Sequence, residues 1–113
     1  MITVEQLKDM GVDTNEGLTR CMNNESFYFR MIKMGLSDKH FDELETLLQK
    51  DDRAAAFESA HALKGVLGNL ALTPLYKPMA EITELLRAKK EADYNTMYAV
   101  VKETREKLLA MCD

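Results

Sequence analysis

The sequence predicts an all-α protein, an antiparallel up-down-up-down four-helix bundle with short covering helices at its N-terminus. Apolar residues recur at spacings of three and four along most of the chain, and helix-capping residues precede several of these segments. No Asn-Gly or Asp-Gly pair lies between alternating apolar runs, so no β-hairpin is indicated. With 113 residues, 46% of them hydrophobic, the chain suits one domain with a single core. We expect residues 1–36 to form the covering helices and residues 37–113 to form the bundle.

The first 36 residues contain signals for three helices. Thr3 and Gln6 have the spacing of a capping box, and Gly11 is a suitable end for that first short helix. A second short helix is expected over about residues 13–22. Asn24 can then cap the segment ESFYFRMIKMG, which we expect to end at Gly35.

Two further helices are expected in the middle of the chain. Ser37 is predicted to cap the segment DKHFDELETLLQK. One side of that segment is an apolar stripe made of Phe41, Leu44, Leu47 and Leu48. Asp51 or Asp52 is expected to cap a longer helix that continues to about Leu70.

The last two helices of the chain each have a start signal in the sequence. Thr73 as a cap with Pro74 at the first helical position indicates one start, but Pro78 lacks a backbone N–H, so the regular helix begins at Pro74 or nearer Pro78. After the charged segment RAKKEAD, Asp93 is expected to cap the final helix. The inner face of that helix is predicted to contain Met97, Val100, Val101, Thr104, Leu108 and Met111.

Composition argues against several classes of partner. The formal net charge is -4 and the basic residues are scattered, so we expect neither a nucleic acid nor a membrane surface as partner. No apolar run approaches the roughly 18 residues that would indicate a membrane span. Cys21 and Cys112 lie far apart without a C-x-x-C pair, which predicts reduced thiols and a cytoplasmic location. A monomer is expected.

His61 lies midway along the longer helix, on the side opposite its apolar positions. At roughly 100° per residue, the core side of this helix contains Ala56, Ala60, Leu63, Val66, Leu67 and Leu70. The side that His61 occupies contains Ala54, Phe57, Glu58, Lys64, Gly65, Gly68 and, if the helix extends so far, Leu72. His61 should therefore face solvent or the edge of a groove. It is either an ordinary surface histidine, free or packed on Phe57, or a functional one.

The two glycines near His61 favour a functional histidine. Gly65 and Gly68 each cost about 1 kcal/mol relative to alanine inside a helix. Close packing against a neighbouring helix would explain them only if they faced the core, and the periodicity places them beside His61 instead. A nucleophilic imidazole needs room for an electrophile larger than water. Lys64, one turn away, would add a positive charge for an anion.

The segment AHALKG, followed by Gly68 and by the pair NL, resembles the signature of histidine-containing phosphotransfer (HPt) domains of multistep phosphorelays. The segment GLTRCMNNESFYFRMI and the order of the helices are similar to that family as well. The resemblance implies that His61 accepts a phosphoryl group from the aspartyl phosphate of a receiver domain and passes it to another receiver. It also implies that Lys64 stabilises the phosphoryl oxygens and that Gly65 leaves space for them. The implied partners are response-regulator receiver domains and a hybrid histidine kinase.

The sequence departs from the HPt pattern at two places. Ala71 stands where many family members have a further glycine, so the end of that helix is expected to differ slightly. The family often supplies a glutamine from the next helix to hydrogen-bond the histidine. That place falls near Thr83, beside Glu84, and the helix contains no glutamine. A threonine hydroxyl at position 83 would be the substitute.

We expect a phosphoryl carrier without autonomous catalysis and without a metal or cofactor of its own. The chain has no phosphate-binding loop and no H-E-x-x-H motif, and His40 has acidic neighbours without metal-ligand spacing. Mg²⁺ is expected only on the partner receiver, which would dock on the His61 face through Ala54, Phe57, Glu58, Gly65, Gly68 and Leu72. Two alternatives remain. One is a receiver-binding adaptor of the same fold that does not transfer phosphate, and the other is a detached phosphoacceptor domain of a chemotaxis-type kinase.

Overall fold

The computed structural model describes residues 2–112, so Met1 and Asp113, the two ends of the predicted domain, lie outside the described residues. The described part is all-α, as predicted, and contains no strand. Its helices are α1 (Val4–Asp9), α2 (Thr14–Arg20), α3 (Glu25–Leu36), α4 (His40–Gln49), α5 (Arg53–Asn69), α6 (Thr73–Arg87) and α7 (Tyr94–Met111).

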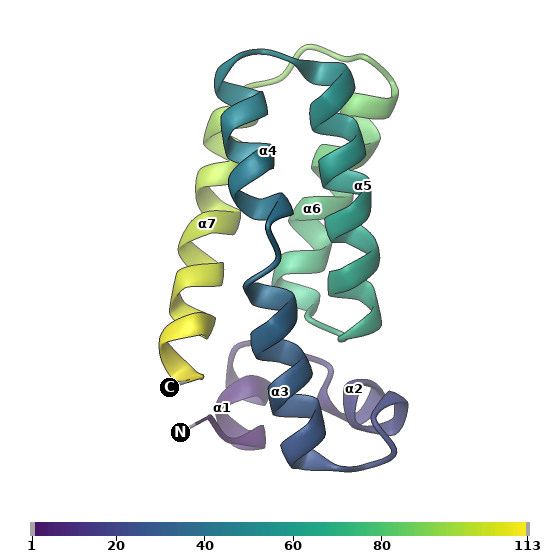
Figure 1. Cartoon of the computed structure of the whole chain (residues 1–113), viewed down its shortest axis with the longest axis vertical. Helices are drawn as coiled ribbons and strands as arrows, with labels where there is room; N and C mark the ends of the chain where they lie inside the picture. The colour runs from purple at the N-terminus through teal and green to yellow at the C-terminus, as the bar shows by residue number, and fades with distance from the viewer. Residues whose placement is uncertain (1, 113) are drawn as a thin grey trace.

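Helices α4 to α7 form the predicted antiparallel bundle, and Figure 1 shows them side by side with short connections at alternating ends. Each packs against two others: α5 lies between α4 and α6, and α7 lies between α6 and α4. Helices α1 and α2 lie at one end of the bundle, next to α3. Helices α5 and α6 are therefore direct neighbours in the bundle.

Most helix starts follow from local capping. Thr3 and Gln6 make the full capping box of α1, and Asn24 and Asp93 accept backbone N–H bonds at the starts of α3 and α7. Of the two candidates for α5, Asp52 is the cap, and its side chain accepts from the backbone N–H of Ala55. These residues hold the helices by hydrogen bonds within four positions, which is why the sequence alone predicts them.

The junction of α3 and α4 differs from the prediction. Gly35 does not end α3, because the helix continues through Leu36 and Ser37 is its C-terminal cap rather than the cap of α4. The Nε–H of Arg105 on α7 donates to the carbonyl of Leu36, with Nε and O 2.7 Å apart. In place of Ser37, Asp38 supports the start of α4 by accepting the backbone N–H of His40 at 2.8 Å.

The function of Gly35 is close packing between helices. A Cβ at this position would lie 2.5 Å from Cδ1 of Leu70 and 3.3 Å from Cγ1 of Val66. Val66, predicted in the core, is only half-buried. Glycine at position 35 thus allows α3 to approach the end of α5.

Helix α6 begins at Thr73 and continues through Pro78, so the earlier of the two predicted starts is right. Leu72, not Thr73, occupies the cap position, and it makes no side-chain cap bond. Pro74 lies in the first turn, where its missing N–H matters least. The turn before α6 is closed by backbone bonds from Ala71 N to Gly68 O (3.1 Å) and from Leu72 N to Leu67 O (3.0 Å). This is the Schellman arrangement, with Ala71 at φ 57° where glycine is usual.

The core face of α7 is rotated from the predicted one. Val100 is 58% exposed, contrary to expectation, whereas Tyr94, Tyr98, Val101 and Leu108 are buried. The tyrosines face inward because their hydroxyls find partners there, and that of Tyr98 donates to the Phe41 carbonyl at 2.7 Å. On α5 the buried side is largely as predicted and contains Ala56, Ala60, Leu63 and Leu67, and the cap residue Leu70 is buried as well. The opposite side of α5 is left for the site.

Candidate functional site

His61 is an exposed residue in the middle of α5, on the side turned away from the core. Its imidazole stacks on the ring of Phe57, one turn earlier, with the ring centroids 5.7 Å apart and the planes inclined by 20°. Within residues 2–112 no hydrogen bond reaches the imidazole. The ring is therefore both accessible to solvent and packed on Phe57.

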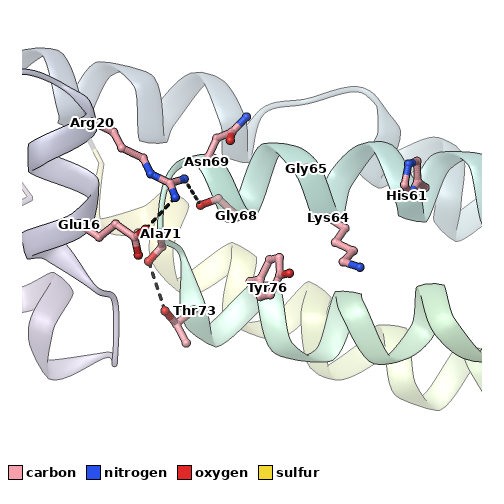
Figure 2. A pocket seen from close by; sticks show the side chains of 10 residues that line it. All are labelled: Glu16, Arg20, His61, Lys64, Gly65, Gly68, Asn69, Ala71, Thr73 and Tyr76. Atoms are coloured by element: carbon pink, nitrogen blue, oxygen red, sulfur yellow. Dashed lines mark hydrogen bonds and ion pairs between the residues drawn. The ribbon is translucent and has the colours of Figure 1, made fainter.

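An open groove of about 500 Å³ begins at His61 and extends along α5 toward its C-terminal end. Figure 2 shows its lining from three helices and the turn between two of them. Helix α5 supplies His61, Lys64, Gly65, Gly68 and Asn69, α6 and the turn before it supply Ala71, Thr73 and Tyr76, and α2 supplies Glu16 and Arg20. The groove brings four predicted site residues together, namely His61, Lys64, Gly65 and Gly68.

The two glycines of the groove differ in their surroundings. No atom would lie within 4 Å of a Cβ at Gly65, so this position leaves open space one turn from His61. A Cβ at Gly68 would lie 3.1 Å from Cε1 and 3.3 Å from Cδ1 of Tyr76. Clearance beside the histidine is thus provided by Gly65, whereas Gly68 allows the Tyr76 ring to lie against α5.

Lys64 is partly buried and is paired across the helices with Glu84 of α6, its Nζ 3.5 Å from Oε2. Glu84 also accepts from Arg87, whose Nε lies 3.2 Å from Oε1. Desolvation opposes ionisation of Glu84, but the charges and hydrogen bonds of Arg87 and Lys64 outweigh it and lower the pKa of this carboxyl. The Lys64 ammonium group is thereby held one turn from His61 along α5, where it is paired with the Glu84 carboxylate.

The far end of the groove is formed by Arg20 and Glu16 of α2, which form an ion pair with Nη2 and Oε1 2.7 Å apart. Nη1 of Arg20 also donates to the carbonyl of Gly68 at 2.9 Å, as Figure 2 shows. Arg20, Glu16 and Tyr76 are not predicted as site residues. The four-residue spacing of Glu16 and Arg20 indicates an ion pair on one helix, but no local pattern indicates that Arg20 reaches the Gly68 carbonyl on α5.

Other predicted docking residues lie on the opposite side of His61. Ala54, Phe57 and Glu58 line a second groove of about 550 Å³, with Arg53 from α5, Leu86 and Arg87 from α6, and Lys89. Ala54 and Glu58 are exposed and Phe57 is half-buried. His61 therefore stands between two grooves along the α5 and α6 pair.

Two of the predicted site residues are not available to a partner. Leu72 is fully buried, because the helix ends at Asn69 and the left-handed Ala71 turns the chain inward. Thr83 is also fully buried, and its Oγ1 donates to the carbonyl of Met79 at 2.7 Å within α6. The expectation that Thr83 replaces the glutamine partner of the histidine is therefore wrong, since its hydroxyl proton is already used by its own helix.

Neither a candidate metal site nor a candidate membrane span lies within the described part of the chain. No group of three or more histidine, cysteine, aspartate or glutamate side chains there is placed to hold a metal ion. No helix within residues 2–112 is both long and apolar enough to cross a bilayer.

Comparison with known families identifies the chain. A model of the Hpt domain matches residues 35–111, which is more than half of the sequence and includes α4 to α7. The searches of curated proteins and of solved structures returned no match. Hpt domains are phosphocarrier modules that take part in histidine phosphotransfer and interact with receiver domains and kinases of phosphorelays. The match over residues 35–111 shows that this chain belongs to the Hpt domain family.

Proposed function

We propose that His61 accepts a phosphoryl group from the aspartyl phosphate of a receiver domain and passes it to the aspartate of a second receiver, in a cytoplasmic two-component pathway. The observation that carries this proposal is the exposed imidazole on a rigid helix, with an ammonium group one turn away and no side chain at Gly65. The phosphoryl donor upstream would be a hybrid histidine kinase, and the chain would act as a monomer.

The transfer needs no proton donor or acceptor from this chain. The lone pair of a neutral imidazole nitrogen attacks phosphorus, the N–P bond forms, and the O–P bond of the acyl phosphate breaks. The aspartate leaves as a carboxylate with the electron pair of that bond. The product is a phosphoimidazolium, and the second transfer reverses these steps on another carboxylate.

Lys64 and Gly65 would serve the phosphoryl group in different ways. Lys64 would leave Glu84 and pair with the phosphoryl oxygens, where a positive charge offsets the negative charge that they carry. Gly65 leaves the volume that the tetrahedral group requires. Mg²⁺ would be supplied by the receiver, which docks on the exposed surface around Ala54, Glu58 and Gly65.

The test is phosphoryl uptake from a panel of phosphorylated receivers, followed by mapping of the acid-labile phosphohistidine. His40→Gln is the matched control, because His40 is the other histidine and its Nδ1 lies against Asp38 Oδ1 at 2.7 Å. We expect label on His61, no label in the His61→Gln variant, and normal uptake in His40→Gln.

Three results would contradict the proposal. Label on His40 would move the acceptor, and receiver binding without any label would indicate an adaptor. Uptake only from ATP with a chemotaxis-type kinase core would indicate the phosphoacceptor domain of such a kinase.

A further inference from the structure

The ring of Phe57 lies between the imidazole of His61 and the guanidinium of Arg87. One neighbour is the His61 imidazole, stacked at 5.7 Å between centroids. The other is the guanidinium of Arg87 on α6, whose Cζ lies 5.0 Å from the centroid of the Phe57 ring. The half-buried phenyl ring thus connects His61 to the neighbouring helix.

The stack matters because it is the contact that the described residues show for the imidazole. No hydrogen bond reaches its nitrogens from residues 2–112, and Thr83 is engaged within α6. Aromatic pairs with centroids 4.5 to 7 Å apart are favourable beyond the area that they bury. Stacking also leaves both imidazole nitrogens free to react, whereas a hydrogen bond to one nitrogen would occupy it.

Arg87 restrains Phe57 and is itself restrained. Its guanidinium donates to Oε1 of Glu84, and the other carboxylate oxygen of Glu84 forms an ion pair with Lys64. Of these two α6 side chains, Arg87 contacts Phe57 and Glu84 contacts Lys64. The linked pair Arg87 and Glu84 therefore limits the movement of the His61 imidazole, through Phe57, and of the Lys64 ammonium group.

We propose that Phe57 is a positioning residue for phosphoryl transfer, which orients the His61 imidazole by stacking and is held in place by Arg87. The inference rests on the proposed function of His61. It predicts that loss of the aromatic ring slows the chemical step even when no receiver takes part.

The experiment separates orientation from docking by using two phosphoryl donors. Potassium phosphoramidate is a small donor: the imidazole–phosphorus bond forms as the P–N bond of the donor breaks and ammonia leaves. A phosphorylated receiver is the second donor. The variants are Phe57→Leu, which keeps apolar bulk without the ring, and Phe57→Tyr, which keeps the ring. Phe27→Leu on α3 is the matched control, since Arg30 lies over Phe27 at 5.8 Å in a similar pair.

With phosphoramidate we expect Phe57→Leu to slow labelling of His61 roughly 2- to 10-fold, the range that loss of one aromatic pair predicts. Phe57→Tyr should stay within about 2-fold of wild type, and Phe27→Leu should not differ from it. The NMR signals of the His61 ring protons should lose their ring-current shift in Phe57→Leu and keep it in Phe57→Tyr.

If Phe57→Leu does not fold, Arg87→Gln gives the same test from an exposed position on α6, with a smaller slowing in the same direction. Equal phosphoramidate rates for wild type, Phe57→Leu and Arg87→Gln would overturn the inference. Slowing only with the receiver, together with weaker receiver binding, would also overturn it, because Phe57 would then be a docking residue. If neither phosphoramidate nor the phosphorylated receiver labels His61 in the wild-type protein, the proposed function itself is refuted.

Discussion

Replacing Gly65 by alanine should make the protein more stable and a poorer phosphoryl carrier. The position is inside α5, is exposed, and has no atom within 4 Å of an added Cβ. The substitution therefore introduces no steric overlap. What remains is the helix preference of alanine over glycine, about 1 kcal/mol, part of which comes from the lower entropy of the unfolded chain.

The stability change can be measured by thermal and urea unfolding followed by circular dichroism. A gain of about 1 kcal/mol should raise the Tm by roughly 4 °C in a domain of this size. Gly68→Ala is the matched control on the same helix. There the added Cβ would lie 3.1 Å from Cε1 of Tyr76, so this ring must shift by a few tenths of an ångström, and that cost opposes the same gain in helix preference. Gly68→Ala should therefore unfold at a lower temperature than Gly65→Ala.

Transfer should respond in the opposite direction to stability. Alanine at position 65 should slow phosphoryl uptake by His61, and Gly65→Gln should slow it much further, because the longer side chain enters the space beside the imidazole. Both variants should melt at or above the wild-type temperature. A fall in stability of Gly65→Ala with normal uptake would refute the reasoning, since it would mean that Gly65 serves packing rather than access.

Three further predictions concern charges. Lys64→Ala should slow transfer or shorten the lifetime of phosphorylated His61 without abolishing uptake, and a loss as complete as in His61→Gln would contradict this role. Glu84→Gln should lengthen that lifetime, because Lys64 loses its competing carboxylate, and the Tm should change little. Burial raises the pKa of Tyr28 to about 12, so stability that is full below pH 10 should fall as the pH rises from 10 to 12, by roughly 2–3 kcal/mol. Alkaline melts should show a shallower decline for Tyr28→Phe, and an unchanged slope would refute the assignment.

Features fixed within one or two helical turns could be predicted from the sequence. The exposure of His61, the opposing buried face of α5 and the caps at Thr3, Asn24 and Asp93 all depend on residues close by in the chain. Helical periodicity and capping chemistry are sufficient for such features.

Features that depend on contacts between helices could not be predicted in the same way. Continuing the helical rotation past Asn69 places Leu72 on the His61 side, but the left-handed Ala71 reverses the chain there. Helical periodicity places both Gly65 and Gly68 on the His61 side of α5. Only the Tyr76 ring from α6, which lies against Gly68 and not against Gly65, distinguishes the two positions. Thr83 has a hydroxyl at the expected place in the chain, but its side chain points into the core of the bundle.

The bond from Arg20 to the Gly68 carbonyl has a consequence for how such a protein can diverge. Helix α5, which contains His61, lies within residues 35–111, which match the Hpt family, whereas Arg20 and Glu16 precede that segment in the chain and form the far wall of the groove. Substitutions in α2 can therefore reshape the far end of the groove while every residue of α5 is retained. One wall of this groove is encoded outside the stretch that the family model matches, so its sequence can change independently of the helix that contains His61.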